Sequence, residues 1–296
     1  MRLFYQLLYH PTLNALLRPL ARFVFQRSHK ELMSIAGDIT FQIEGQAFTL
    51  RTNQTCFVTK YMFYNGLDAY EYNWIFPALS KQARSFLDVG ANIGLYSVMA
   101  AKLNPKLEIH AFEPGKGAVH FLRENCRINQ LDQVHIHELA MSDTDTEAYF
   151  HEAGHPKFPW LAHNLNGSSS LQAAHGRQKA VRYPVQVQRL SSFLNAVPLP
   201  HIDLIKLDTE HTEQLILADN RALISEHQPV IMIEVYPEVA SEIQTQVQQW
   251  PSYRVYQLQK RQLVQIACSE LGLSTTAVNY LLVPEAKQNW IAAYCS

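Results

Sequence analysis

The chain has 296 residues, of which 47% are apolar and 17% are charged, and its formal net charge is −1. This length suits one large domain, or one domain with an appendage, and the balance is that of a globular protein without a disordered tract. A near-neutral chain without a basic run gives no indication of nucleic-acid binding. No stretch reaches the ~20 consecutive apolar residues that would span a bilayer.

The four cysteines are widely spaced and include no C-x-x-C pair. This spacing favours reduced thiols over a disulfide framework or a zinc site, and it predicts a cytoplasmic protein. The four are Cys56, Cys126, Cys268 and Cys295.

Residues 1–30 are apolar and basic and contain no acidic residue. Pro11 and Pro19 are expected to break this segment into short helices. It lacks the apolar core and cleavage site of a signal peptide. Two interpretations stay open. A basic amphipathic helix can lie on an anionic membrane surface; the favoured interpretation is a helix packed on the domain or on a partner subunit of an oligomer. The five cations are Arg2, Arg18, Arg22, Arg27 and Lys30.

Residues 39–43 and 47–50 predict a β-hairpin around Gly45. An aromatic-rich stretch follows at residues 61–72, and a helix is expected to begin within residues 72–79. We expect most of these aromatic side chains to belong to the core and some to border the mouth of the active site and select the acceptor. We therefore expect an N-terminal helical segment over residues 1–36, a hairpin and aromatic helix over residues 37–84, and the main domain over residues 85–296.

The main domain opens with a strand–glycine turn–helix–strand unit. The strand at residues 85–89 leads into the turn G-A-N-I-G at residues 90–94, then a helix at 95–103 and a strand at 107–112 that ends in Glu113. This is the βαβ pattern of nucleotide-binding sheets. Glycine in the turn would let a ligand approach the backbone. A carboxylate at Glu113 suits the two hydroxyls of a ribose.

The acid before the turn distinguishes among nucleotides. The dinucleotide fingerprint G-x-G-x-x-G has three glycines, whereas only Gly90 and Gly94 are present here. Asp88 lies two residues before Gly90. It would repel a pyrophosphate, but it tolerates a cationic ligand. S-adenosylmethionine carries a sulfonium and an ammonium and has no phosphate. The sequence therefore favours a methyl donor over NAD, and an NAD-dependent dehydrogenase is the weaker alternative.

Further strands and helices alternate along the chain, which predicts an α/β doubly wound, mostly parallel sheet covered on both faces. The last two predicted strands suit an antiparallel edge. Residues 151–182 predict a long polar loop that contacts substrate, and its histidine spacing matches no metal-ligand motif. The predicted strands are 134–139, 146–150, 184–190, 202–207, 229–235, 254–258 and 279–283, and the predicted helices are 115–129, 237–250 and one beginning near 212.

Five segments in this order resemble the FkbM family of S-adenosylmethionine-dependent methyltransferases. They are DVGANIGLYS (88–97), AFEP (111–114), AMSD (140–143), IDLIKLDTE (202–210) and the pair Pro229 and Glu234. The resemblance covers roughly residues 85–237. It implies a class I methyltransferase fold, Rossmann-like, and methylation of hydroxyls on sugars, glycans or macrocyclic natural products.

The resemblance also implies roles for particular residues. The methionine half of the cofactor would be held by Asp88, Gly90, Ala91, Asn92 and Gly94. Glu113 and the adjacent Pro114 would lie at the ribose, and Ser142 and Asp143 near the adenine. Two positions depart from the family pattern. His211 stands where the family usually has the glycine of D-x-E-G-x-E, and Ser191 stands where it usually has aspartate after leucine.

An alcohol acceptor benefits from a general base within hydrogen-bond reach. We hypothesise that Asp208 or Glu210 accepts the proton, with Glu234 in support and Lys206 at the same sheet edge. His211 is a second candidate base, because imidazole titrates near neutral pH.

Two other interpretations of this region stay open. Asp208, Glu210 and Glu234 could instead supply oxygen ligands to a divalent cation. The departures at Ser191 and His211 could also have dismantled the acceptor site, leaving a non-catalytic S-adenosylmethionine-binding protein.

Overall fold

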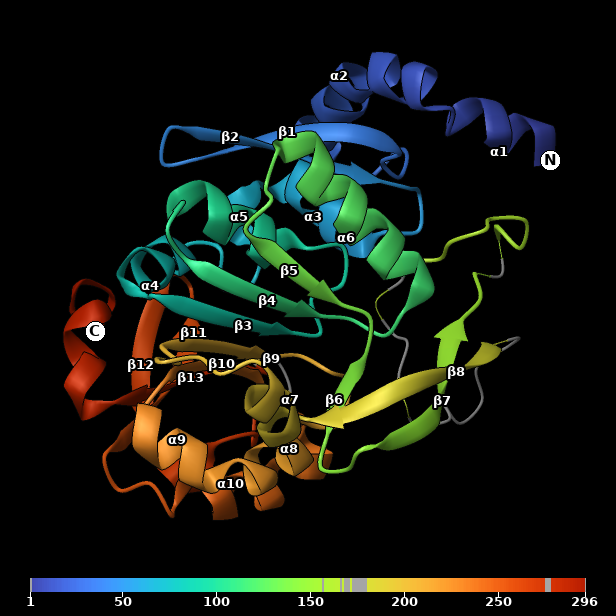
Figure 1. Ribbon diagram of the computed structural model, residues 1–296. Helices are drawn as coiled ribbons and strands as arrows, with labels where there is room; N and C mark the ends of the chain where they lie inside the picture. Colours follow the sequence, from blue (N-terminus) through green and yellow to red (C-terminus); the bar gives the residue numbers. More distant parts are fainter. Residues whose placement is uncertain are drawn as a thin grey trace.

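The structure, a computed structural model, describes residues 2–155, 157–165, 167, 171, 180–274 and 278–295. Its centre is an eight-stranded sheet with the order β12-β11-β13-β10-β9-β3-β4-β5 (Figure 1). Five neighbouring strands, from β10 to β5, run parallel, and the other three are antiparallel. This confirms the predicted α/β class with an antiparallel edge. The strands are β3 (Ser85–Val89), β4 (Glu108–Phe112), β5 (Val134–His137), β9 (Leu204–Leu207), β10 (Val230–Glu234), β11 (Tyr253–Gln259), β12 (Gln262–Ile266) and β13 (Asn279–Pro284).

The antiparallel edge contains a strand that the sequence pattern did not reveal. β12 pairs with β11 through a two-residue turn formed by Lys260 and Arg261. Both residues have positive φ, at 45° and 67°, a backbone conformation that hairpin turns usually assign to glycine or asparagine. Without those residues the turn carries no sequence signal, and the outer strand was missed.

The strand predicted at residues 184–190 belongs to a separate small sheet. β8 (Ala180–Arg189) lies between β6 (Ala140–Ser142) and β7 (Thr146–Ala153) in the order β6-β8-β7. The alternating pattern identified a strand, but alternation does not name its partner. The loop predicted at residues 151–182 is too long at both ends, which belong to β7 and β8. Thirteen of its 32 residues, including His175 and residues 168–170, lie outside the described residues.

Helices cover both faces of the large sheet (Figure 1). Successive strand residues contribute to two hydrophobic cores, one on each face of the sheet, because side chains alternate between faces. Phe86 joins the core on one side and Leu87 the core on the other. The helices are α3 (Phe57–Asn65), α4 (Phe76–Gln82), α5 (Leu95–Leu103), α6 (Lys116–Asn129), α7 (Leu190–Ala196), α8 (Glu213–Asp219), α9 (Arg221–His227) and α10 (Ala240–Val247).

Short 3₁₀ turns complete the connections, and two of the predicted helices are divided. The helix expected at 237–250 is a 3₁₀ turn followed by α10, and the one expected from about 212 is α8 followed by α9. The turns are η1 (Leu67–Ala69), η2 (Pro237–Val239), η3 (Cys268–Glu270), η4 (Glu285–Trp290) and η5 (Ala292–Tyr294).

The predicted hairpin is present as β1 (Gly37–Ile43) and β2 (Gln46–Thr52). Asparagine side chains of α6 form hydrogen bonds with backbone groups on the outer edge of β2. Asn129 Oδ1 accepts from the backbone N–H of Thr49 at 2.9 Å, and Asn125 Oδ1 accepts from that of Arg51 at 2.6 Å. An edge strand is thereby covered by a helix rather than left open to pairing with another chain.

Two helices precede the hairpin, α1 (Arg2–Leu8) and α2 (Pro11–Ser28). Pro11 begins α2 as predicted, but Pro19 lies inside the helix and does not end it. Pro19 is exposed, so water can satisfy the carbonyl that loses its helical partner there. None of the helices in the described part of the chain is both long and apolar enough to cross a bilayer.

Candidate active site

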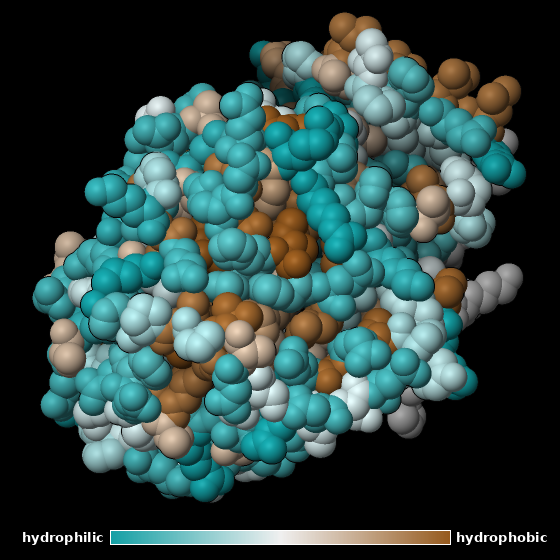
Figure 2. Space-filling model, in the orientation of Figure 1, coloured by the Kyte–Doolittle hydropathy of each residue, from teal (hydrophilic) through white to brown (hydrophobic). Residues whose placement is uncertain are grey.

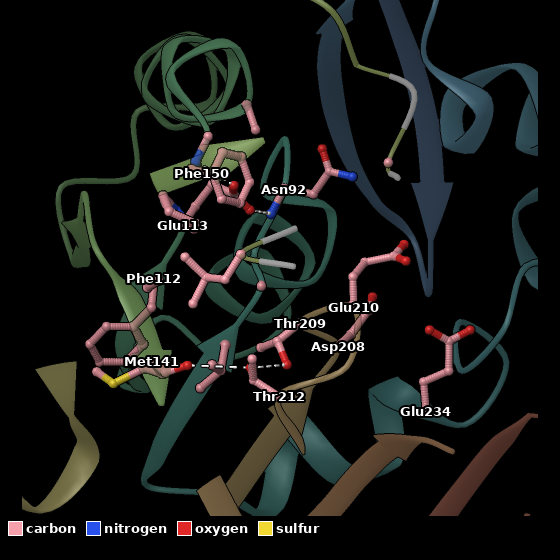
Figure 3. Close-up of a pocket in the computed structure, with 18 of the residues that line it drawn as sticks. Asn92, Phe112, Glu113, Met141, Phe150, Asp208, Thr209, Glu210, Thr212 and Glu234 are labelled. Atoms are coloured by element: carbon pink, nitrogen blue, oxygen red, sulfur yellow. Dashed lines mark hydrogen bonds between the residues drawn. The ribbon is translucent and has the colours of Figure 1, made fainter. Parts of the chain in front are cut away.

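A cavity of about 330 Å³ opens at the carboxyl ends of β3, β4, β9 and β10. Open α/β sheets place their ligands at this edge. Seven of the site residues predicted from the sequence line the cavity: Gly90, Asn92, Glu113, Pro114, Asp208, Glu210 and Glu234. Figure 3 shows their arrangement, with Phe112, Met141 and Phe150 at one end and Asp208, Glu210 and Glu234 at the other.

The glycines of the turn are required by contacts within the protein. Gly90 has φ +78°, and a Cβ there would lie 1.7 Å from the carbonyl oxygen of Asp208. Gly94 has φ +85°, and a Cβ there would lie 2.3 Å from a methyl group of Leu122. The expectation that glycine serves ligand approach is therefore incomplete. The turn must first fit between β9 and α6, and only Gly90 and Asn92 of its residues face the cavity.

Glu113 is buried and held in a fixed orientation. Its two carboxylate oxygens accept from the backbone N–H groups of Asn92 and Gly115, each at 2.8 Å. Burial raises the pKa of Glu113 to about 7, although these two hydrogen bonds favour its charged form. Each carboxylate oxygen can accept a second hydrogen bond, so Glu113 can still receive the hydroxyls of a diol.

Beneath the turn, Lys206 joins two acids of neighbouring strands. Its Nζ lies 3.0 Å from Asp208 Oδ2 and 3.9 Å from Asp88 Oδ1, and it donates to the carbonyl of Gly90 at 3.0 Å. Burial alone would lower the pKa of Lys206, but the two carboxylates outweigh it and hold that pKa above its ordinary value. Asp88 is fully buried and accepts from Ser97 at 2.6 Å. Asp88 and Lys206 therefore support the turn from below, outside the cavity lining.

The other end of the cavity is mainly apolar. Phe112, Leu139, Met141 and Phe150 line it beside Glu113, and Glu152 is a further carboxyl group in the lining. Ser142 and Asp143, predicted near an adenine, lie just beyond this lining, and Ser142 donates to Asp143 at 3.2 Å. Ala91 and Gly94 also lie behind the lining.

The acidic end contains a carboxylate that the sequence interpretation missed. Glu71 lines the cavity and accepts a hydrogen bond from Tyr96 at 3.1 Å. Burial and the nearby charge of Asp208 raise the pKa of Glu71 to about 7. The same two causes raise the pKa of Glu234 to about 9. The charge of Asp208 thus contributes to the raised pKa of both Glu71 and Glu234.

Other lining residues were also missed, and they differ in the signal they gave. Tyr236 follows the predicted strand by two residues, and Thr209 and Thr212 lie within the D-T-E-H-T segment, so their positions were available in the sequence. Tyr70 belongs to the aromatic stretch, most of whose other members are core. Tyr70 is one of the members of this stretch that border the site, as the sequence interpretation expected for some of them. Nothing in the sequence indicates that Glu71 lies near strands more than 100 residues away.

The turn after β9 keeps its shape without the expected glycine. His211 has φ +85° and Glu210 has φ +58°. The buried Glu213 holds the turn by accepting from the backbone N–H groups of Thr209 and His211, at 2.6 and 3.1 Å. The His211 ring packs against Tyr236, with centroids 5.0 Å apart, and His211 lies outside the cavity lining.

The second departure lies away from this cavity. Ser191 is the second residue of α7, and its hydroxyl donates to Asp219 at 3.3 Å. Asp219 also pairs with Arg189. The carboxylate expected at position 191 would therefore stand next to an acid that already pairs with this arginine.

The alternative of a cation site at Asp208, Glu210 and Glu234 finds no support in the geometry. Among the residues that the structure describes, no group of three histidine, cysteine or acidic side chains is arranged to hold a metal ion. The nearest cation to Asp208 is instead the Lys206 ammonium.

A family model and two curated relatives match this chain. The Methyltransferase FkbM domain family matches residues 88–259, more than half of the chain. The chain is 29% identical over 159 residues to the 2-O-methyltransferase NoeI of Sinorhizobium fredii, covering 51% of this chain and 63% of that protein. It is 27% identical over 155 residues to Methyltransferase 1 of Beauveria bassiana, covering 49% and 60%. The chain thus spans less than two thirds of the length of these relatives.

Among solved structures, a methyltransferase FkbM from Methylobacillus flagellatus KT is similar at 13% identity and a TM-score of 0.45. The alignment covers 76% of this chain and 52% of that one.

Proposed function

This chain belongs to the FkbM methyltransferase family, and we propose that it transfers a methyl group from S-adenosylmethionine to a hydroxyl group of a sugar or glycan, or of a glycosylated or macrocyclic natural product. The observation that carries this proposal is the division of one cavity into an apolar end beside Glu113 and an end with four carboxyl groups. The similar protein from S. fredii has a name that specifies methylation on oxygen, which supports a hydroxyl acceptor.

The residues present fit this methyl donor. Phe112, Met141 and Phe150 offer apolar surface for an aromatic base, and Glu113 can accept from the two ribose hydroxyls. The carboxyl groups at the other end suit a ligand with a sulfonium and an ammonium, because opposite charges attract strongly in a partly desolvated site. Membership in a methyltransferase family replaces the NAD-dependent alternative.

When bound, S-adenosylmethionine supplies an activated methyl electrophile, so the protein mainly has to place the acceptor oxygen in line with it. We assign the orientation and deprotonation of the acceptor hydroxyl to Asp208. Its ion pair with Lys206 fixes its position, and its side chain is 32% exposed, so it can still accept from a hydroxyl. Glu71 is the second candidate base, since a pKa of about 7 suits proton acceptance near neutral pH.

The remaining residues then have supporting roles. With a pKa of about 9, Glu234 is protonated at neutral pH and can donate a hydrogen bond to an acceptor oxygen. Glu210 lines the cavity and is placed to contact the acceptor. His211 packs on Tyr236 outside the lining, which favours a structural role for this residue over proton transfer.

The non-catalytic alternative loses its main support in the geometry. It rested on the departures at Ser191 and His211. Ser191 lies away from the cavity, and His211 adopts the positive φ that the missing glycine would have had. Neither departure disrupts the acidic end of the cavity.

Calorimetric titration with S-adenosylhomocysteine tests the cofactor assignment. We expect saturable binding that is lost in Glu113→Ala and kept in Glu108→Ala, a matched control at the exposed start of the same strand. NAD should not bind. If Glu113→Ala binds as tightly as the unmodified protein, the assignment of this cavity to the cofactor is wrong. Transfer of labelled methyl groups to hydroxylated glycans then tests the acceptor class.

A further inference from the structure

The first two helices carry an apolar surface that the rest of the described chain does not cover. Seven of the twelve large hydrophobic side chains that are exposed in the described residues lie in α1 and α2. Leu16 and Leu3 are 73% and 70% exposed. In Figure 2 these side chains form a brown area at the upper right, over α1 and α2. The seven are Leu3, Phe4, Leu7, Leu13, Leu16, Leu20 and Phe23.

The spacing in α2 places this surface on one side of the helix. Leu13, Leu16, Leu20 and Phe23 recur at intervals of three and four residues, which puts them on one stripe. The opposite stripe holds the helix on the protein. Asn14 is fully buried, and its side chain donates to Ser34 O at 3.1 Å and accepts from the N–H of Ala36 at 3.0 Å. α2 is therefore anchored on one face and leaves a second apolar face outward.

The charged side chains of α1 and α2 themselves are all cationic. Residues 1–30 contain five cationic side chains and no acid. Arg18 is used inward, donating to the carbonyls of Asp38 and Ala36 at 2.6 and 2.7 Å. Arg27 lies over the ring of Phe23, 4.3 Å from its centroid, so a cation stands directly beside the apolar stripe.

We propose that α1 and α2 dock the protein on the surface of a lipid bilayer that contains anionic headgroups. The leucine and phenylalanine side chains would enter the boundary between headgroups and acyl chains. The exposed cations Arg2, Arg22, Arg27 and Lys30 would contact the phosphates. This combination of an apolar face and cationic flanks is that of interfacial helices. Each nearby cation adds attraction to an anionic leaflet.

A second copy of the chain fits this face less well. A symmetric dimer through α1 and α2 would bring the cations of both copies into one interface. With no acid in residues 1–30, the face itself offers no charge to compensate them. An anionic bilayer supplies both the apolar layer and the opposite charge.

Flotation of the full chain with vesicles tests the proposal. We expect the protein to float with vesicles of phosphatidylcholine and phosphatidylglycerol and to float weakly with phosphatidylcholine alone. Leu16→Glu with Phe23→Glu should reduce the vesicle-bound fraction at least about tenfold, because two large apolar groups are replaced by anions. Leu273→Glu is the matched control, since Leu273 is 67% exposed elsewhere on the chain, and it should float as the unmodified protein does. Arg22→Glu with Arg27→Glu should remove the preference for anionic vesicles.

S-adenosylhomocysteine binding by each variant shows whether it is folded, since α2 contributes nothing to the cavity lining. The proposal is wrong if the unmodified protein does not float with anionic vesicles, or if the Leu16 and Phe23 variant floats as well as the Leu273 control. Size-exclusion chromatography tests the alternative, in which a second copy of the chain covers this face. A dimer that becomes a monomer in the stripe variant, without vesicle binding, would assign the face to a second copy.

Discussion

Two turns follow two neighbouring parallel strands at the same edge of the sheet, and they meet the same backbone demand in different ways. After β3, the turn at residues 90–94 has positive φ at Gly90, Asn92 and Gly94. After β9, the turn that begins at Asp208 has positive φ at Glu210 and His211. The first turn uses mainly glycine in this conformation, and the second uses residues with large side chains.

The surroundings of the two turns account for the difference. At Gly90 there is no room for a side chain, because the backbone of Asp208 and Thr209 in the second turn lies against it. The second turn borders the cavity, where Glu210 contributes a carboxylate. A non-glycine residue at positive φ costs of order 1–3 kcal/mol and persists where the surrounding structure holds it. Here Glu213 does so through its hydrogen bonds to Thr209 and His211. Both turns are held by hydrogen bonds. They differ in that packing at Gly90 excludes a side chain, whereas the turn on the acceptor side accommodates large side chains.

Gly90→Ala tests the packing of the first turn and should have the largest effect on stability. We expect the free energy of unfolding to fall by about 3–5 kcal/mol, because both the positive φ and the overlap with the Asp208 carbonyl oppose a Cβ. Urea denaturation measures this loss. Gly45→Ala is the control, since Gly45 has φ +80° and nothing within 4 Å of its Cβ position, and it should lose only about 1–2 kcal/mol. Equal losses in the two variants would mean that overlap with the Asp208 carbonyl is not what requires Gly90.

Asp208→Asn acts on the acceptor side and should leave the fold intact. We expect kcat to fall about 10²–10⁴-fold, the usual contribution of a general base, while affinity for S-adenosylhomocysteine changes little. Steady-state methyl transfer and calorimetry measure the two quantities. Asp132→Asn, at an exposed acid outside the cavity lining, is the control. If Asp208→Asn retains full kcat and Glu71→Gln does not, the base is Glu71.

The buried carboxyl groups of both sides should make the free protein less stable as pH rises. Burial raises the pKa of Glu71 and Glu113 to about 7 and that of Glu234 to about 9, from an ordinary value of 4.5. The folded protein therefore holds these protons more tightly than the unfolded chain does. Their contribution to stability is complete below the unfolded pKa, and it is lost as pH rises through the folded values.

Urea denaturation between about pH 4.5 and 9 distinguishes the contributions of these carboxyl groups to stability. Glu113→Gln should flatten the decline between about pH 4.5 and 7, and Glu234→Gln should flatten it up to about pH 9. Asp208→Asn should move the upper part of the decline to lower pH, because the charge of Asp208 raises the pKa of Glu234. A pH dependence that is unchanged in Glu234→Gln would contradict the raised pKa of that group.

The sequence predicts the cofactor side of the site better than the acceptor side. Gly90, Asn92 and Glu113 lie within one continuous βαβ unit, so spacing alone places them at one sheet edge. Glu71 reaches the same cavity only because the aromatic segment before β3 packs beside β9 and β10. That is a tertiary contact without a local pattern.

The same distinction explains the errors in the fold. Hydrophobic alternation identified the strand at residues 184–190, but its partners β6 and β7 depend on pairing across the small sheet. The outer strand β12 was missed because Lys260 and Arg261 form its turn without glycine. Pro19 was expected to end a helix, and its exposed position in α2 allows the helix to continue.

His211→Gly tests the hydrogen-bonded turn with the smallest expected effect. Glycine accepts φ +85° without strain, so the substitution should raise the free energy of unfolding by about 1 kcal/mol, even though glycine also gains freedom in the unfolded chain. His201→Gly is the control in an irregular segment at negative φ, and it should destabilise slightly. kcat should be unchanged in both variants, as measured by methyl transfer. A large fall in kcat with unchanged stability would instead make His211 the catalytic base, and the positive φ would then be a strain that the protein tolerates to place an imidazole. A gain in stability with full activity would mean that histidine at this position only occupies the turn, and that the proton is accepted by one of the carboxylates facing the cavity.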